Sequence, residues 1–399
     1  MAIGAFFGAK WNFANAVSSR TDQPDIAALA SSLAPADPQT RFAYARLLES
    51  SFDPEAGQRA LIEYEYAVAA SPYNYLTWYQ LGRARSRSGD MPGAETALTR
   101  ALELAPNYAE VQWALGNHYL RTDRSGEGFA LIRKAVSGRS AYAPSAASLA
   151  LKFADGDALA ALDMLGRDSR SAGPLSLILI SEGKLIEAAR VWDSLADADA
   201  RSISSDSASQ IISKLLEAKQ YSLAARIDRK IRGVGSPEGL VSNGGFESPV
   251  KTTGAGPFDW QLSDGGEVQI RISTSEKRSG EQSLAFLFDN KRSTEFREVR
   301  QLIPVEPGAE YEFTVYYRSE LRGASTVRWD IVNASTGGPI ASTSAADPNA
   351  DWAPLTIRFR TPSDLDGVMV KLVRDGCPTV FCPISGRLWF DDISVRKVS

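Results

Sequence analysis

The sequence predicts an α + β multidomain protein, in which an α-solenoid of helical hairpins is followed by an antiparallel β-sandwich. Up to about residue 232, Ala, Leu, Arg and Ser dominate, and apolar residues recur at the i, i+3, i+4 spacing of helices. From residue 240, short alternating runs of Val, Thr, Tyr and Phe are separated by Gly, Pro, Asn and Asp, which is typical of strands. The predicted parts are an apolar N-terminal segment 1–20, a helical region 21–232, a Gly/Pro-rich linker 233–239 and a β domain 240–399.

The helical region repeats with a period of 34 residues. Leu-Gly ends at Gly82 and again at Gly116, and Pro72 recurs as Pro106. This pattern resembles the tetratricopeptide repeat, in which a small residue such as Gly82 lets two antiparallel helices approach closely. The resemblance implies a groove that binds a protein partner, and a rigid spacer is the alternative. The clearest repeats lie within 38–142, at 38–73, 75–108 and 109–142, and two or three degenerate hairpins fill 143–232.

Composition excludes several classes of function. The 399 residues carry a net charge of −4, which argues against a general nucleic-acid interface. One His, His118, and two Cys are too few for zinc sites built from several such ligands, for haem or for iron–sulfur clusters. A Ser–His–Asp enzyme would need His118, and no Gly-x-Ser-x-Gly motif occurs in the chain. We therefore expect no enzyme; a carboxylate pair such as Glu247 with Asp392 is the remaining catalytic hypothesis.

The N-terminal segment has three interpretations. Residues 2–9 are apolar, Lys10 interrupts them, and a weaker apolar run follows. The segment could be the remainder of a membrane anchor, an amphipathic helix that docks on its own domain or on a partner, or a degenerate signal peptide. No run of about 18 apolar residues occurs, so nothing in the sequence clearly spans a bilayer.

The β domain carries a series of family-like landmarks. It opens with Asn-Gly-Gly-Phe-Glu at 243–247, continues with Pro-Gly-Ala-Glu-Tyr at 307–311, and ends with Trp-Phe-Asp-Asp at 389–392. This order resembles the jelly-roll carbohydrate-binding modules of families four and nine and related galactose-binding-like domains, over essentially all of 240–399. The resemblance implies a jelly-roll β-sandwich and a glycan ligand.

Sugar binding would need aromatic rings for stacking and polar side chains for the hydroxyls. Alternation along 311–318 puts Tyr316 and Arg318 on the face opposite the expected core. A face with Tyr316 and several Arg could bind an acidic glycan, and a solvated sheet face is the alternative. Trp329 and Trp389 are expected in the core. The candidate residues are Trp260, Tyr316, Arg318, Arg358 and Trp352.

The resemblance also implies a structural Ca²⁺ held by carboxylates where the first and last strands meet. The residues concerned are Glu247, Asp391 and Asp392, whose hard oxygen atoms suit this ion. The alternative is that these acids cap turns and pair with Arg. No other cofactor is expected.

The two cysteines, Cys377 and Cys382, lie five residues apart between Gly and Pro. We interpret them as a short disulfide that closes a loop, with two free thiols as the alternative. A disulfide would place the protein in an oxidising compartment, which is the periplasm, the cell surface or the exterior.

Together these features predict a non-catalytic protein of the bacterial cell envelope or exterior. Its sandwich would bind a glycan and its solenoid a protein partner or a second copy of the chain, with possible membrane attachment through residues 1–20. The alternative is a structural subunit that assembles into a surface filament or scaffold.

Overall fold

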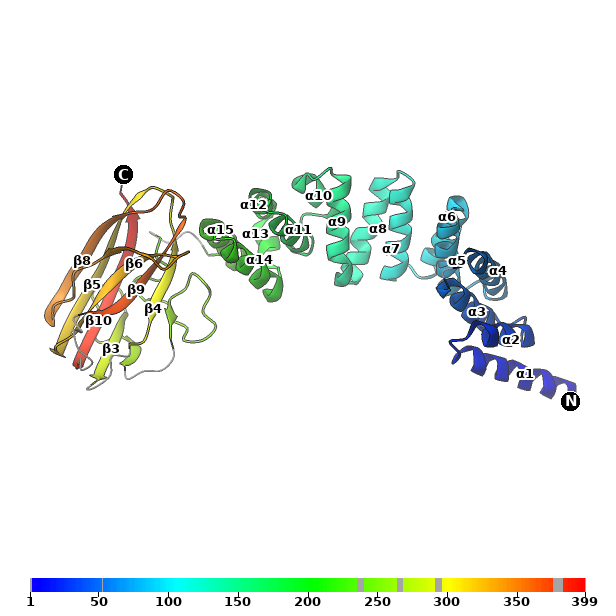
Figure 1. Ribbon diagram of the computed structural model, residues 1–399, viewed down its shortest axis with the longest axis horizontal. Coiled ribbons are helices and arrows are strands. Elements are labelled where there is room, and N and C mark those ends of the chain that lie inside the picture. Colours follow the sequence, from blue (N-terminus) through cyan, green and yellow to red (C-terminus); the bar gives the residue numbers. More distant parts are fainter. Residues whose placement is uncertain are drawn as a thin grey trace. The chain divides into compact units, whose positions relative to one another are not determined.

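The computed structural model describes residues 2–51, 53–234, 240–263, 268–290, 296–375 and 383–398. In this part of the chain fifteen α-helices precede two antiparallel five-stranded sheets (Figure 1), which confirms the predicted α-then-β architecture. Contacts divide the chain into two compact units, Met1–Ile178 and Leu179–Ser399. The last helices therefore belong to the same unit as the sandwich.

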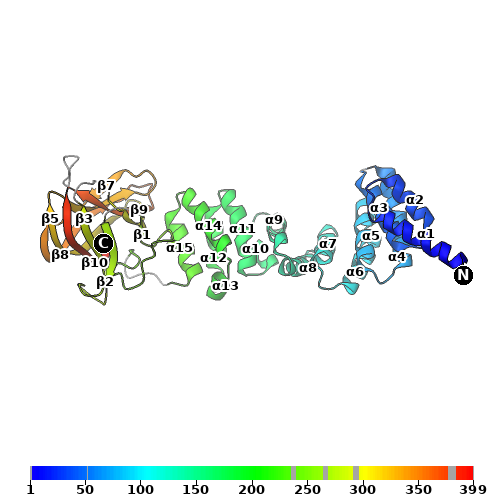
Figure 2. The same cartoon turned by 90° about the horizontal axis from the view of Figure 1, so that it is seen from below.

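The first unit consists of consecutive helices that pair as hairpins (Figures 1 and 2). Each predicted repeat within 38–142 contains one pair: α3 with α4, α5 with α6, and α7 with α8. The helices are α1 (Ala2–Ser18), α2 (Pro24–Leu33), α3 (Pro38–Ser50), α4 (Pro54–Ala70), α5 (Tyr75–Ser88), α6 (Met91–Leu104), α7 (Ala109–Arg121), α8 (Ser125–Gly138), α9 (Ala143–Phe153), α10 (Ala158–Leu165) and α11 (Ser169–Ser181), which crosses the division.

Local sequence signals set the ends of these helices. The side chains of Asp37, Asp53 and Asn74 each accept a hydrogen bond from a backbone N–H of the first turn of α3, α4 and α5. Pro follows the two Asp caps, at a position where its missing N–H has no intrahelical partner. Gly89 ends α5 with φ of 88°, a left-handed conformation that glycine adopts without strain.

Two glycine contacts explain the close approach of the paired helices. A Cβ on Gly82 would lie 2.6 Å from the Leu98 Cγ, and a Cβ on Gly116 would lie 3.0 Å from the Gly128 carbonyl oxygen. Gly82 and Gly116 are equivalent positions of successive 34-residue repeats. The repeat therefore reflects the close approach of the two helices in each hairpin as well as hydrophobic periodicity.

The N-terminal segment forms α1, whose Ala14 is buried against Ala30 and Ala34. Trp11 and Phe13 of the same helix are 46% and 62% exposed. Among the described residues, no helix is both long and apolar enough to cross a membrane.

The second unit contains four complete helices and the sandwich. One sheet has the order β1-β4-β9-β6-β7 and the other β2-β3-β10-β5-β8, and the core between them includes Trp329, Phe313 and Phe390. Residues 235–239 of the predicted linker lie outside the described residues. The helices are α12 (Leu185–Asp193), α13 (Asp197–Arg201), α14 (Ser205–Glu217) and α15 (Tyr221–Arg232). The strands are β1 (Gln261–Leu262), β2 (Val268–Ser273), β3 (Ser283–Asn290), β4 (Val299–Pro304), β5 (Glu310–Gly323), β6 (Thr326–Asn333), β7 (Pro339–Ser342), β8 (Asn349–Arg360), β9 (Gly367–Asp375) and β10 (Ile384–Lys397).

The start of α15 is bonded directly to the sandwich. The Asp366 carboxylate accepts hydrogen bonds from the backbone N–H groups of Tyr221 (3.3 Å) and Ser222 (3.0 Å). The Tyr221 hydroxyl lies 3.1 Å from the Ser335 Oγ, and a Cβ on Gly367 would lie 2.5 Å from the Tyr221 ring. Asp366 thus supplies the cap that Gln220, at the N-cap position of α15, does not provide with its side chain.

Candidate functional site

The outward-pointing residues of β5, β8 and β10 form the candidate site, which we call the outer sheet face. Along β5, Val315 and Tyr317 are buried in the core and alternate with Tyr316 and Arg318, which point outward. The antiparallel register places Trp389 of β10 opposite Arg318. Strand pairing therefore brings together aromatic and charged side chains that are about 70 residues apart in sequence.

Trp389 is the central ring of this face. It is 4% exposed, and the guanidinium groups of Arg318 and Arg387 lie 5.7 and 5.5 Å from its ring centroid. Sequence reasoning expected Trp389 to be buried rather than a ligand platform, and it is buried. The residues that cover it lie on the outer sheet face, since it is not part of the cluster between the two sheets. The signal was present in the sequence, because Arg387 and Trp389 alternate with the core residue Leu388.

A second aromatic contact lies beside the first. The Arg278 guanidinium is 3.4 Å from the Tyr316 ring centroid, and the same group pairs with the Asp392 carboxylate. Tyr316 is opposite Asp391 in the β5–β10 register. Arg278 therefore extends the outer sheet face toward the loop that precedes β3, a contribution that the sequence analysis missed.

The arginines of this face are matched by carboxylates. Arg318 lies 2.6 Å from the Glu276 carboxylate and 3.6 Å from that of Glu320, which also lies 2.6 Å from Arg387. Arg358, a predicted site residue, lies 2.9 Å from the Glu312 carboxylate and is largely exposed. These pairs leave little net positive charge on the face to attract an acidic polymer, such as the acidic glycan that the sequence left open beside a solvated sheet face.

The two other predicted tryptophans lie in different surroundings. Trp352 is partly exposed on β8 and alternates with Ala353, which packs against the core, so it shares the outer sheet face with Arg358. Trp260 is 2% exposed and its ring packs against Phe246 and Trp329, which is a correction to its assignment as a sugar-binding residue. Trp329 is fully buried, as expected.

The three carboxylates of the predicted calcium site have protein donors as neighbours. Asp391 is fully buried, which raises the pKa of its carboxyl, and it accepts hydrogen bonds from the backbone N–H groups of Arg278 (2.8 Å) and Ser279 (3.2 Å). Asp392 accepts one from the Ser279 hydroxyl at 2.7 Å, and Glu247 accepts two from backbone N–H groups at 2.9 and 3.1 Å.

These contacts match the alternative interpretation, in which the acids cap turns and pair with Arg. Within the described part of the chain, no group of three or more His, Cys, Asp or Glu side chains is arranged to hold a metal ion. Backbone N–H, hydroxyl and guanidinium donors contact both oxygens of Asp391 and Asp392, and the two donors at Glu247 share its Oε1. A structural calcium stays a prediction from the family resemblance. The predicted disulfide between Cys377 and Cys382 lies outside the described residues.

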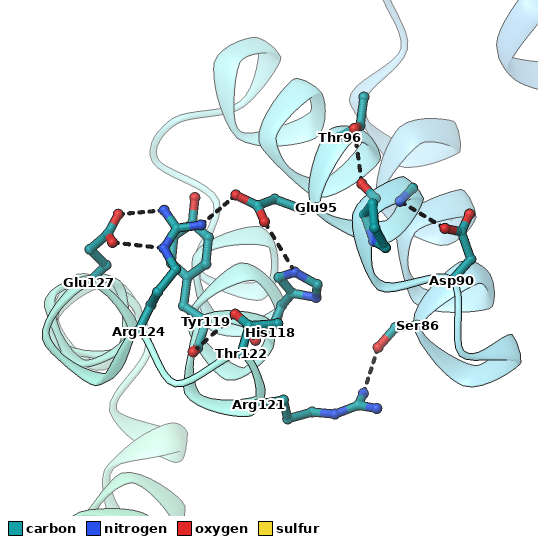
Figure 3. A network of polar contacts seen from close by, with 12 residues as sticks. Ser86, Asp90, Glu95, Thr96, His118, Tyr119, Arg121, Thr122, Arg124 and Glu127 are labelled. Atoms are coloured by element: carbon teal, nitrogen blue, oxygen red, sulfur yellow. Dashed lines mark hydrogen bonds and ion pairs between the residues drawn. The ribbon is translucent and has the colours of Figure 1, made fainter.

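The first unit carries a polar cluster around the single histidine, in which His118 is buried and its charged neighbours are partly exposed (Figure 3). The His118 Nε2 lies 3.7 Å from a Glu95 carboxylate oxygen, and the other oxygen of Glu95 lies 2.6 Å from Arg124. Arg124 also pairs with Glu127 at 2.7 Å, so one chain of charges connects α6, α7 and α8. Burial lowers the pKa of His118, and Glu95 only partly opposes this effect.

A groove of about 640 Å³ lies among α1, α3 and α5 of the same unit. Phe42, Leu47 and Leu76 contribute its apolar lining, and Arg46 contributes a positive charge. Arg46 is exposed, and its side chain pairs with no described residue. The groove thus combines apolar side chains with hydroxyl and amide groups and one exposed cation.

Comparisons with known proteins give distant structural matches only. No protein-family model matches the sequence, and no curated protein matches it. A solved CBM4 structure matches with 18% identity and a TM-score of 0.30, over 40% of this chain and 99% of that one. A CBM61 structure from a complex with β-1,4-galactotriose has 16% identity, a TM-score of 0.30 and the same coverage. A crystal structure of MamA has 15% identity and a TM-score of 0.29, over 42% of this chain and 81% of that one.

Proposed function

We propose that the outer sheet face binds a neutral glycan and that the protein acts as a non-catalytic binding protein. The observation that carries this proposal is the pair of partly exposed rings on this face, Tyr316 and Trp352, beside fixed arginine and carboxylate groups. Trp389 is buried beneath Arg318 and Arg387 and supports the face from below. Aromatic rings can stack on the apolar faces of sugar rings, while fixed arginine and carboxylate groups donate to and accept from hydroxyls. A polysaccharide ligand would place the protein in the cell envelope or outside the cell.

The test is a glycan array with the full-length protein, followed by titration of any polymer that binds. Tyr316→Ala and Trp352→Ala should each weaken binding several-fold, because each removes a ring from the face. Tyr73→Ala is the matched control, since Tyr73 is 81% exposed in the helical unit. A folded protein that binds no glycan, or variants that bind as well as the wild type, would contradict the proposal.

For the helical unit we propose a protein partner, held in the groove among α1, α3 and α5. Its support is the apolar lining with Arg46 beside it. Arg46→Glu should abolish capture of the partner protein. Arg59→Glu, a charge reversal on α4 outside the groove, is the control and should leave capture unchanged. Binding that survives Arg46→Glu would place the partner elsewhere.

The alternative role, assembly into a filament, has one supporting observation. Phe13 and Leu29 are 62% and 58% exposed on α1 and α2, which leaves apolar surface that a second copy could cover. Light scattering over a concentration series distinguishes the two roles. Growth of large particles in the wild type, reduced by Phe13→Ser with Leu29→Ser, would favour the filament.

A further inference from the structure

A second cleft lies within the second unit, away from the outer sheet face. It has a volume of about 450 Å³, in the range of small-molecule sites. One wall is the C-terminal half of α15, and the other is formed by residues 240–260 together with the end of β4. None of the residues that form the outer sheet face lines it.

Bonds at both ends of α15 hold the walls of this cleft in place. At the start of the helix, Asp366 accepts the two backbone hydrogen bonds described above. At the end, the Arg232 Nη1 donates to the Asp259 Oδ1 at 2.9 Å, and the Gly256 N–H donates to the Asp259 Oδ2 at 2.9 Å. The cleft therefore has a preformed shape, which lowers the entropic cost of binding.

The charges in the cleft are unevenly matched. Arg232 pairs with two carboxylates, Asp228 (2.9 Å) and Asp259, and Asp228 is itself only 9% exposed. Arg229 and Lys251 also line the cleft, and the side chain of neither pairs with a described residue. Arg232 with its two carboxylates carries a net charge of −1, and Arg229 and Lys251 act through space on Asp228 and Asp259, so the five charged residues of the lining have a net charge of +1. This excess of one positive charge favours a ligand with one anionic group.

Apolar and hydroxyl groups complete the lining. Val250, Phe258 and Leu302 provide apolar contact, and Ser242 and Ser248 provide small polar groups. We propose that this cleft binds a carboxylate-bearing saccharide of one or two rings. Arg229 and Lys251 would hold the carboxylate, while the apolar side chains would contact the CH face of a ring. This site goes beyond the proposed glycan binding, because it uses other residues and takes an anionic ligand instead of a neutral one.

The test is calorimetric titration of the full-length protein with glucuronate and digalacturonate, compared with galactose and digalactose. The acidic sugars should bind, the neutral ones should not compete, and added salt should weaken binding. The double variant Arg229→Gln with Lys251→Gln should lose about tenfold or more in affinity. Arg226→Gln is the matched control, because it removes one charge from the same helix at a residue that does not line the cleft.

Further measurements distinguish this site from the outer sheet face and a saccharide ligand from an acidic peptide. Tyr316→Ala should leave uronate binding unchanged; a loss there would assign the acidic sugar to the outer sheet face and overturn the inference. No uronate binding by the wild type, or equal binding by the double variant, would also overturn it. A glutamate-rich peptide that binds in place of the sugars, with the same dependence on Arg229 and Lys251, would replace the saccharide by an acidic polypeptide.

Discussion

His118 is the single histidine of the chain, and its side chain is 1% exposed. Neither ring nitrogen makes a hydrogen bond to a described residue, and the nearest carboxylate, that of Glu95, is mainly held by Arg124. At the residue scale the neutral imidazole is thus a packed part of the helical core. Protonation of His118 should therefore change the free energy of unfolding.

We expect the unfolding free energy of the protein to fall as the pH drops below about 6.5. Burial lowers the folded-state pKa of His118 below its ordinary value of 6.5, so the unfolded chain takes up the proton first. The stabilising contribution of the neutral His118 is complete above its pKa in the unfolded chain and is lost as the pH falls toward its pKa in the folded protein. Over that interval the unfolding free energy falls by at most about 1.4 kcal/mol per pH unit. Urea unfolding between pH 7 and 5.5 measures it.

The control for this prediction is His118→Gln, which removes the titrating group. Its stability should vary less over the same pH interval. NMR titration of the one imidazole of the folded protein gives a direct check, and a value at or above 6.5 would contradict the assignment.

At the scale of single elements, the helical hairpins depend on glycines that leave no room for a side chain. Gly116 on α7 faces the Gly128 carbonyl of α8, whereas Gly57 on α4 has nothing within 4 Å of where a Cβ would lie. The same residue type therefore has opposite roles in two helices.

Gly116→Ala should destabilise the protein by about 1–3 kcal/mol, because the added methyl group forces α7 and α8 apart. Gly57→Ala should instead stabilise it by up to about 1 kcal/mol through helix propensity. Thermal unfolding of both variants measures the difference, and the same sign for both would refute the packing argument.

The start of α15 gives a second prediction at this scale. Asp366→Ala removes the acceptor for the N–H groups of Tyr221 and Ser222 and should cost about 1 kcal/mol, as the loss of a helix cap does. Asp364→Ala, two residues away and exposed, is the matched control. Equal unfolding midpoints for the two variants would show that the cap contributes nothing.

At the scale of the whole molecule, the chain forms two compact units that meet at Ile178, and α12–α15 belong to the same unit as the sandwich. The contacts of Tyr221 with Gly367 and Ser335 explain this grouping, because they bury the end of the helical region against the β domain. The change of composition near residue 235 therefore marks a change of secondary structure within one compact unit.

A fragment of residues 179–399 should accordingly be more stable than a fragment of residues 240–399. Loss of the helices exposes Leu302 and the Gly367 edge and removes the bonds to Asp366 and Asp259. We expect the unfolding midpoint to fall by at least about 3 °C, which corresponds to roughly 1 kcal/mol in a protein of this size. Differential scanning calorimetry measures it, and identical midpoints would mean that the sandwich is independent of α15.

The sequence by itself determined the two kinds of secondary structure, the 34-residue repeat and the inward and outward faces of β5, because each depends on periodicity within one element. For the same reason it placed Tyr316 and Arg318 on the outward face of one strand and Arg358 on the outward face of another, and strand pairing in the structure joins these faces. Only the tertiary structure decided that Trp260 lies in the core, that Arg318 of another strand joins Arg387 over Trp389, and that Asp366 caps α15. These depend on strand register and on pairs far apart in the chain, which local periodicity does not encode.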